Sequence, residues 1–431
     1  MTHDPAAVAA APAADPSPLP DRAPAGISLK ALAIRGSLWT FAGYGASQVL
    51  RLGSSLVMTR LLFPEAFGLM TMVGVVMYGL AMMSDLGIGP TIVFDPRGDD
   101  PTFLNTAWTV QVVRGVLLWL VACAIAWPAA SFYGEPQLRA LISVAALSAV
   151  LSGFSSTRME TARRHLALGR ITVIEIAAQA VTIAVSVLWA LKWRDVWALV
   201  LGGLAGSAVR TVLSHTYLPG ERNRFAWDRD SARVLQGYGK WIYLGSILYF
   251  VATQSDRLMV GRLLDMATLG IYAIAMNLLD PIVNLNQRIW RSVMLPALSR
   301  VYRETPERFS ELFYRARLRS DLLFAGGSGA VMALGTVVVT FLYDPRYAAA
   351  GLLLQIVAVR GLLVSVAEPL EQCLSARRLP KFVTLSHVGR TAWIAAAIPI
   401  GWYLGGLKGI ALAAATAEIP VVLTFWFVLG R

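Results

Sequence analysis

Three arginine residues stand inside stretches that are otherwise apolar: Arg51, Arg114 and Arg360. A charged side chain near the centre of a membrane-spanning helix costs on the order of 3 kcal/mol, so it normally faces a water-filled cavity or a partner of opposite charge. No acidic residue lies within one helical turn of any of the three on its own stretch. Because a guanidinium stays charged at this depth, these residues are candidates for binding an anionic ligand inside the membrane.

A stripe of polar residues accompanies Arg51 on one face of its expected helix, because its members lie three, four or seven residues apart. They are Thr40, Tyr44, Ser47, Gln48 and Ser55. A second stripe contains Ser246, Tyr249, Thr253 and Asp256, with Arg257 beside it. Asp256 and Arg257 could equally neutralise each other as an intramembrane ion pair. With Gln111 added, which lies one turn before Arg114, the candidates for lining a cavity are Arg51, Arg114, Arg360, Arg257, Asp256, Tyr44, Gln48, Gln111, Tyr249 and Thr253.

Acidic residues also fall within apolar stretches. Glu175, Asp280 and Glu368 are candidates for ion coupling, and the alternative is that they balance neighbouring arginines. Arg210 and Arg390 lie one or two turns inside the cytoplasmic ends of their stretches, where a long side chain can extend to the lipid headgroups. We therefore expect these two arginines at the membrane surface.

Motifs for hydrolysis or metal chemistry are missing from the sequence. It contains no GxxxxGK[ST] phosphate-binding loop, no HExxH and no cluster of His and Cys. Cys123 and Cys373 fall on separate stretches with no evident reason to meet, so we expect packing residues rather than a disulfide. The sequence predicts no catalytic residues, no metal site and no cofactor, and hence a protein that is not an enzyme.

The elements that must position these residues are long apolar helices. Hydrophobic residues make up 56% of the chain and charged residues 15%, which is more apolar than a soluble core requires. A membrane span needs roughly 20 mostly apolar residues. About twelve stretches reach that length: 36–58, 66–90, 104–127, 138–157, 171–191, 195–215, 238–262, 267–289, 320–342, 348–374, 382–404 and 408–429.

The basic residues predict how the chain is oriented. With a cytoplasmic N-terminus, the inner loops hold roughly three times as many Lys and Arg residues as the outer loops, as in most multi-pass membrane proteins. Both termini are therefore predicted to be cytoplasmic. The net charge of +12 is explained by these loops, so nucleic acid is not expected as a partner. The outer loops hold Arg60, Arg139, Lys192, Arg194, Arg262, Arg346 and Lys408.

A weak internal repeat divides the chain into two halves. Arg60-Leu61-Leu62 followed by Gly68 matches Arg262-Leu263-Leu264 followed by Gly270, at an offset of about 202 residues that also aligns the two polar stripes. Parallel repeats of this kind are typical of transporters with a substrate site between the halves. The predicted fold is an all-α polytopic membrane protein with about twelve transmembrane helices in two six-helix bundles. The expected parts are a disordered Ala/Pro-rich cytoplasmic tail at 1–30, an N-terminal bundle at 31–220, a cytoplasmic linker at 221–236, and a C-terminal bundle at 237–431 with a cytoplasmic surface helix at 291–318.

The order and placement of four segments resemble the oligosaccharide flippases of the polysaccharide biosynthesis family, in the multidrug/oligosaccharidyl-lipid/polysaccharide exporter superfamily. The segments are RGSLWTFAGYGASQVLRLGSSLVMTRLLFPEAFGLMTM at 35–72, SDLGIGPTIV at 84–93, SDRLMVGRLLDMATLGIYAIAMNL at 255–278 and LPALSR at 295–300. The resemblance covers roughly residues 30–430 and implies translocation of an undecaprenyl-diphosphate-linked oligosaccharide across the bacterial inner membrane, for exopolysaccharide, capsule or lipopolysaccharide O-antigen assembly. Implied partners are this polyprenyl-diphosphate lipid, membrane lipids, and polymerase and export proteins of the same pathway.

Other functions fit the sequence less well. A cation-coupled multidrug exporter of the same superfamily would need an essential acid in a compact cavity rather than a surplus of arginines. A polymerase or glycosyltransferase acting on lipid-linked sugar would need a sizeable extramembrane loop or a catalytic carboxylate motif, and neither is present. A membrane scaffold would have little reason to place arginines at mid-depth.

Overall fold

The computed structural model describes residues 29–84, 87–237 and 239–429. The predicted tail at 1–30 lies almost wholly outside this part of the chain. Side chains of two members of the polar stripes, Thr40 and Ser246, are also outside it. Within the described ranges, the regular structure is helical, as predicted for an all-α protein.

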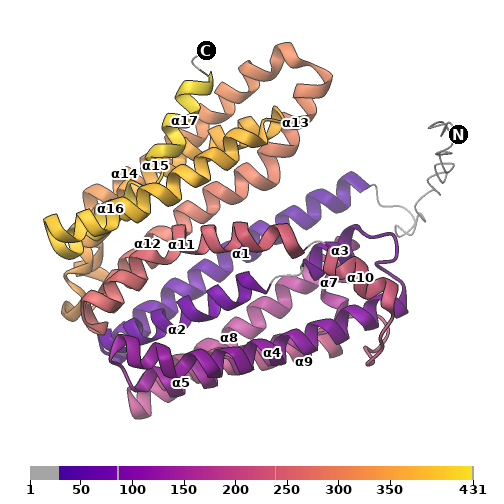
Figure 1. Ribbon diagram of the computed structural model, residues 1–431, viewed down its shortest axis with the longest axis horizontal. Helices are drawn as coiled ribbons and strands as arrows, with labels where there is room; N and C mark the ends of the chain where they lie inside the picture. The colour runs from indigo at the N-terminus through magenta and orange to yellow at the C-terminus, as the bar shows by residue number, and fades with distance from the viewer. Residues whose placement is uncertain (1–28, 85–86, 238, 430–431) are drawn as a thin grey trace, which may run out of the picture.

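The described residues of the first half form nine helices, which lie in the lower part of Figure 1. Local residues set several ends: Pro64 starts a helix, the Asp100 side chain accepts a hydrogen bond from Thr102 N–H, and Gly134 ends the next helix with a φ of 70°. The helices are α1 (Leu29–Leu61), α2 (Pro64–Met83), α3 (Ile88–Phe94), α4 (Pro101–Tyr133), α5 (Gln137–Ala145), α6 (Leu147–Gly153), α7 (Arg158–Arg164), α8 (Leu168–Trp193) and α9 (Trp197–Thr216).

Most of the second half forms the upper part of Figure 1, whereas its first helix, α10 (Arg229–Gly237), lies low in the view next to α3 and α7. Its helices are α10 (Arg229–Gly237), α11 (Gly239–Leu263), α12 (Met266–Ile289), α13 (Leu295–Glu304), α14 (Phe309–Leu342), α15 (Ala350–Ala376), α16 (Pro380–Ala415) and α17 (Ile419–Leu429). A π-helical turn over 290–294 joins α12 to α13, and a short 3-10 turn over 306–308 joins α13 to α14. The segment 291–318 is therefore helical; that it lies on a cytoplasmic surface stays a prediction.

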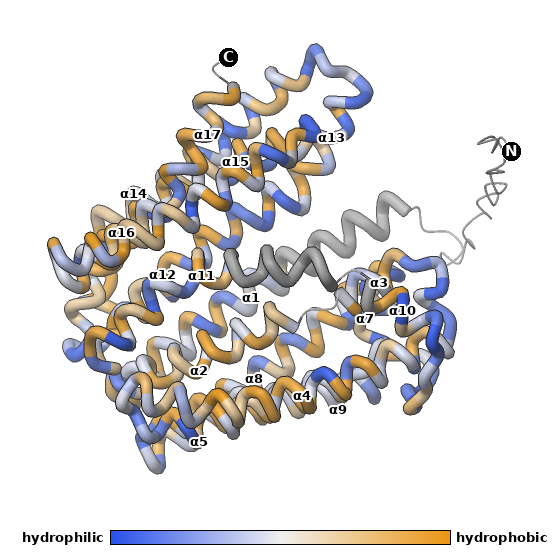
Figure 2. Tube along the Cα trace, viewed as in Figure 1, coloured by the Kyte–Doolittle hydropathy of each residue, from blue (hydrophilic) through white to orange (hydrophobic). Residues whose placement is uncertain are grey.

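Eight helices of the described residues are long and apolar enough to cross a membrane, or nine if the bent pair of 137–153 and 158–164 is one span. Figure 2 shows orange, hydrophobic residues along α4, α9 and α15, and blue, hydrophilic residues around the turns next to α13 and α10. The helices α1 and α11 are not among the eight, and each of them carries one of the two polar stripes. The chain is thus a polytopic helical membrane protein, and the count of twelve spans stays a prediction.

α16 is a helical hairpin rather than one straight helix. Its backbone leaves helical geometry at Gly405 and Gly406, where Gly406 has a φ of 55° that favours glycine. Contacts then pair Trp393 with Thr416 and Arg390 with Glu418, as two antiparallel segments require. The turn falls between the expected spans 382–404 and 408–429, so the predicted reversal of the chain is confirmed.

The two repeat motifs meet each other where the halves pack together. A Cβ atom on Gly68 would lie 1.8 Å from the carbonyl oxygen of Met266, and one on Gly270 would lie 1.9 Å from that of Pro64. The two glycines therefore let α2 and α12 cross with their backbones in reciprocal contact. This explains why the glycine recurs at the same spacing in both halves.

A latch formed by Asp344, Arg346 and Tyr347, after α14, strengthens this end of the molecule. The Tyr347 hydroxyl donates a hydrogen bond to the Leu62 carbonyl at 3.0 Å, and the Arg346 guanidinium donates one to the Arg60 carbonyl at 3.2 Å. Hydrogen bonds from Arg346 lower the pKa of Asp344, so that carboxylate holds Arg346 in place. In Figure 1 the halves diverge from this end toward the end with α13, α7 and α10, where the arginine-rich loops lie.

The linker between the halves is an ordered strap along α4. Backbone N–H groups of Arg224, Ala226 and Asp228 donate hydrogen bonds to the side chains of Asn105, Thr109 and Thr106 at 2.9 to 3.1 Å. The Phe225 ring packs against the Trp108 ring with their centroids 4.7 Å apart. The strap thus fixes the start of the second half to the first.

Candidate functional site

A polar pocket of about 280 Å³ lies between the middle parts of α1, α8 and α9. Arg51 from α1 lines it, and within the described residues its guanidinium makes no hydrogen bond or ion pair. The Arg210 guanidinium lies 2.9 Å from the Glu175 carboxylate, and both side chains are partly exposed to the pocket. Arg210 is thus paired with Glu175 of α8 at the wall of the pocket, and its expected position at the headgroups stays a prediction.

Amide and hydroxyl groups complete this pocket. Gln179 accepts a hydrogen bond from the Ser47 hydroxyl and donates one to the Ser47 carbonyl at 2.9 Å, which joins α8 to α1. A Cβ atom on Gly206 would lie 1.9 Å from the Thr182 hydroxyl, so this glycine lets α9 approach α8. Gly203, one turn earlier, faces open space on the pocket wall.

Tyr44 and Gln48 link the first half to the second. The Tyr44 hydroxyl donates to the Pro281 carbonyl of α12 at 3.3 Å and accepts a hydrogen bond from Gln48 at 2.8 Å. The Arg288 guanidinium lies 4.9 Å from the centre of the Tyr44 ring, a cation–π contact. No pattern in the sequence predicts this contact, because Tyr44 and Arg288 lie in different halves of the chain.

Arg114 and Gln111 lie on the part of α4 that contacts the ends of α2 and α6. Neither residue lines the Arg51 pocket. Arg114 donates hydrogen bonds to the Ser84 hydroxyl at 3.0 Å and to the Ala81 carbonyl at 3.2 Å, at the end of α2. The Gln111 amide nitrogen lies within hydrogen-bond distance of three carbonyl groups at and just after the end of α6, including that of Ser152 at 3.0 Å. These contacts satisfy helix-terminal carbonyls and so position α2 and α6.

A second, tighter cavity of about 40 Å³ lies in the other half, between α11, α12, α15, α16 and the turn that precedes α17. Asp256 lines it and is buried, and its carboxylate accepts a hydrogen bond from the Tyr272 hydroxyl at 2.7 Å. Arg257 instead bonds Gln254, one turn earlier on α11, at 2.8 Å. Among the ion pairs of the described residues, none joins Asp256 to Arg257. The other lining residues with polar side chains are Tyr249, Thr253, Gln287, Arg360, Arg390 and Glu418.

Arginine–carboxylate pairs join the helices around this cavity. Arg360 lies 3.8 Å from Asp280, and Arg291 lies 2.8 Å from Glu368, whose side chain is only 4% exposed. All three acids proposed for ion coupling, Glu175 included, therefore have an arginine partner. That pairing fits the alternative in which they balance arginines, and a coupling role for any of them remains a prediction.

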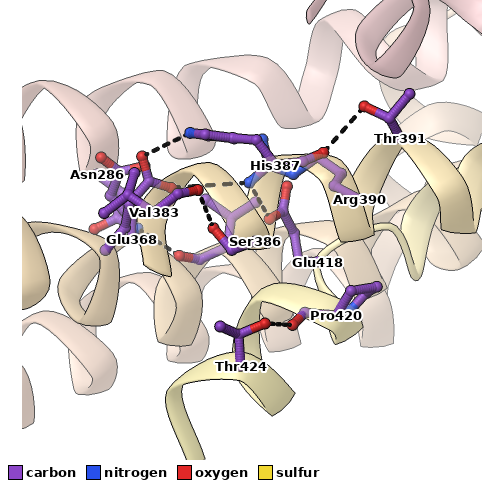
Figure 3. Close-up of polar contacts among 12 residues, drawn as sticks. Asn286, Glu368, Val383, Ser386, His387, Arg390, Thr391, Glu418, Pro420 and Thr424 are labelled. Atoms are coloured by element: carbon purple, nitrogen blue, oxygen red, sulfur yellow. Dashed lines mark hydrogen bonds and ion pairs between the residues drawn. The ribbon is translucent and has the colours of Figure 1, made fainter. Parts of the chain in front are cut away.

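Arg390 belongs to a buried network of polar side chains, part of which is shown in Figure 3. Its guanidinium points toward Glu418 and contacts it at 2.5 Å, with the Glu371 carboxylate at 4.0 Å and His387 3.5 Å from Glu371. The Arg390 side chain is 14% exposed, so the expectation that it extends to the headgroups is wrong. Two buried acids hold it in the bundle instead.

The two cavities occupy corresponding places in the two halves. The first lies among the first, fifth and sixth expected spans of its half, and the second lies beside the same three spans of the other. Each has an ion pair between its fifth and sixth spans, with the charges exchanged: Glu175 with Arg210, and Arg390 with Glu418. The first cavity is the larger and has the unpaired Arg51, so it is the better candidate for holding an anionic group.

The described residues contain no group of three or more His, Cys, Asp or Glu side chains placed to bind a metal ion. The chemistry of the two cavities is therefore that of hydrogen bonding and of charge pairing by guanidinium groups.

Comparisons with known proteins identify relatives of the whole chain. Residues 57–350 match the family described as "Polysaccharide biosynthesis protein". The chain is 25% identical over 410 residues to "Lipopolysaccharide biosynthesis protein WzxC" of Escherichia coli (strain K12), which covers 94% of this chain and 82% of that protein. It is 27% identical over 266 residues to "Amylovoran biosynthesis protein AmsL" of Erwinia amylovora, covering 60% of this chain and 67% of that one.

Solved structures share the fold at low sequence identity. The structure described as "Lipid II flippase MurJ, inward closed conformation" has a TM-score of 0.72 and 12% identity, over 92% of this chain and 88% of that one. An inward-facing MATE family multidrug resistance transporter of the MOP superfamily has a TM-score of 0.68 and 14% identity, over 89% and 94%. The family match covers well over half of the sequence and confirms the predicted resemblance, so the chain belongs to the polysaccharide biosynthesis family of membrane transport proteins, which are not enzymes.

Proposed function

We propose that this protein is a flippase that moves an undecaprenyl-diphosphate-linked oligosaccharide repeat unit from the cytoplasmic to the periplasmic leaflet of the bacterial inner membrane. The product would serve exopolysaccharide, capsule or O-antigen assembly. The observation that carries the proposal is Arg51, a guanidinium without a carboxylate partner among the described residues, in a polar pocket between apolar helices. A diphosphate needs such a group, because its charge cannot cross about 30 Å of hydrocarbon unaided.

The surroundings of Arg51 suit the head of such a lipid. Arg210 can supply a second guanidinium if its partner Glu175 is released, and Ser47 and Gln179 offer hydrogen-bond donors. The polyprenyl tail needs no protein cavity, since it can remain in the bilayer while the head passes between the halves. The head group of the lipid would reach Arg360 and the cavity of the second half later in transport, when the halves change their relative position.

The arrangement of the halves fits alternating access. The end with Arg60 and Arg346 is held by the latch and the Gly68–Gly270 crossing, whereas the halves diverge toward the end with the arginine-rich loops. With the sidedness that these loops predict, this form would admit substrate from the cytoplasm. Polymerase and export proteins of the same pathway would receive the product.

A cation-coupled multidrug exporter is the alternative. Such a protein needs a carboxylate that is free to bind a cation within its cavity. Among the described residues in and around the cavities, four acids pair with arginines: Glu175, Asp280, Glu368 and Glu418. Asp256 accepts a hydrogen bond from the Tyr272 hydroxyl. The surplus of guanidinium over free carboxylate favours an anionic substrate.

The test is complementation of a null strain with Arg51→Ala and Arg51→Lys at matched membrane levels. We expect Arg51→Ala to reduce polymer export about tenfold or more, with lipid-linked repeat accumulating on the cytoplasmic leaflet, and Arg51→Lys to restore part of it because lysine keeps the charge but not the bidentate geometry. Arg139→Ala, an exposed arginine on α5 outside the pocket, is the control. Normal export in Arg51→Ala would contradict the proposed site, and normal export in the null strain would contradict the function.

A further inference from the structure

A third cavity, of about 600 Å³, lies at the latch end of the first half, where α2, α5 and α9 begin. It is remote from the Arg51 pocket, which lies at mid-helix. Its volume falls within the range of roughly 300 to 1,000 Å³ that is usual for small-molecule sites. Its walls and rim are formed by Phe63, Glu65, Gln137, Arg194, Asp195 and Trp197.

The floor of this cavity is rigid and apolar. Leu69, Leu141 and Val196 are each at most 6% exposed and belong to the main hydrophobic core. The Trp197 ring, partly buried, packs against the same core, and the Asp195 carboxylate is fixed by a 2.9 Å hydrogen bond from the Trp189 indole. Buried core side chains and a hydrogen-bonded carboxylate thus form the floor and part of the wall of the cavity.

Three polar side chains on the rim of the cavity are available to bind a ligand. Among the described residues, Glu65, Gln137 and Arg194 make no side-chain hydrogen bond or ion pair, and all three are exposed. They offer a carboxylate acceptor, an amide that both donates and accepts, and a guanidinium donor. Phe63, with 55% of its surface exposed, presents a ring face beside them.

This combination fits a carbohydrate. A sugar ring carries hydroxyl groups that both donate and accept, together with C–H faces that pack on aromatic rings. A phosphate group alone would be repelled by Glu65 and Asp195, and an apolar molecule would leave the polar rim unpaired. Carboxylate, amide and guanidinium around two aromatic rings satisfy both parts of a sugar.

We propose that this cavity is a carbohydrate-binding site that holds the oligosaccharide head of the transported lipid at the outer surface. The inference rests on the proposed flippase function, and it names a second site for the sugar that is separate from the intramembrane site for the diphosphate. Phe63 links this cavity to the latch, because the Arg346 guanidinium lies 4.8 Å from the centre of the Phe63 ring. A glycan that engages Phe63 competes with Arg346 and favours opening of the latch.

Binding is tested on the purified full-length protein in lipid nanodiscs, by saturation-transfer NMR and calorimetry. The probe is the repeat oligosaccharide released from the polymer of the producing bacterium, without lipid or diphosphate. We expect Glu65→Gln and Trp197→Ala each to weaken binding about tenfold, the effect of losing one charge-assisted hydrogen bond or one ring contact. Glu65→Gln keeps its shape at an exposed position and so tests the site even if Trp197→Ala folds poorly.

Matched controls lie at the same end of the molecule. Glu135→Gln and Trp127→Ala alter a carboxylate and an exposed ring that do not line the cavity, and both should bind as the wild type does. Absent binding to the wild type, or equal binding by Glu65→Gln and Glu135→Gln, would overturn the inference. The two failures are distinguishable, because loss of polymer export in the null strain and its recovery with the wild-type gene test the flippase proposal whether or not the released oligosaccharide binds in this cavity.

Discussion

At the residue scale, the direction in which a side chain leaves its helix decides which partner it meets inside the bundle. Asp256 and Arg257 are adjacent in the sequence, but consecutive residues on a helix point in directions about 100° apart. Asp256 therefore meets Tyr272 on the next helix, and Arg257 meets Gln254 one turn back. The partner of Glu368 is Arg291, 77 residues away, and no local pattern reveals such a contact.

The buried pair of Arg390 and Glu418 gives a stability prediction at this scale. Arg390→Met leaves Glu418 and Glu371 buried without their cation, which should destabilise the fold by about 3 to 5 kcal/mol. The double variant Arg390→Met/Glu418→Gln should recover much of this loss, because no uncompensated charge from the pair remains. Thermal unfolding of the solubilised protein, followed by size-exclusion chromatography, measures both.

Arg315→Met is the control for that experiment. Arg315 pairs with Glu311 at 2.8 Å, but the side chains are 73% and 55% exposed, so the loss should stay below about 1 kcal/mol. Equal unfolding temperatures for Arg390→Met and Arg315→Met would show that the Arg390 network does not stabilise the bundle.

At the element scale, the sequence was far more informative. Long apolar stretches predicted the positions of α4, α8, α9, α12, α14 and α15, because a segment in lipid must satisfy its backbone internally and a helix does so. The strap along α4 was predicted only as a linker, since its order comes from backbone hydrogen bonds to Asn105, Thr106 and Thr109 that have no sequence pattern. Likewise, the continuation of α12 into α13 was not visible in the sequence.

The crossing of α2 and α12 gives the element-scale prediction. Gly68→Ala places a Cβ atom against the Met266 backbone, which cannot yield as a flexible side chain could, so we expect a loss of about 1 to 3 kcal/mol or more. Gly74→Ala, on the same helix with open space around it, should be neutral or stabilising by up to about 1 kcal/mol. Unfolding temperatures and membrane levels compare the two, and matching values would mean that the close crossing is not needed.

At the scale of the whole molecule, the repeat predicted two halves but not which end would be closed. A transporter populates conformations whose free energies differ by a few kcal/mol, and one sequence must encode them all. The structure identifies the closed end by the contacts of Arg346 and Tyr347 with the carbonyl groups of Arg60 and Leu62 at the end of α1, and by the crossing of Gly68 and Gly270. Which end of the molecule faces the cytoplasm is predicted by the arginine-rich loops alone.

If alternating access is the mechanism, holding the latch closed must stop transport. In a variant lacking Cys123 and Cys373, cysteines at Arg60 and Arg346 should be bridged by a short, reducible bifunctional thiol reagent, since the Arg346 guanidinium reaches the Arg60 carbonyl in this form. Bridging should abolish export of the lipid-linked repeat in membrane vesicles, and reduction should restore it. The same reagent on cysteines at Arg300 and Glu304, one turn apart on α13, joins no moving parts and should leave export unchanged. Continued export with the latch bridged would mean that the substrate passes without this end opening, and the rocking of the two halves would have to be abandoned.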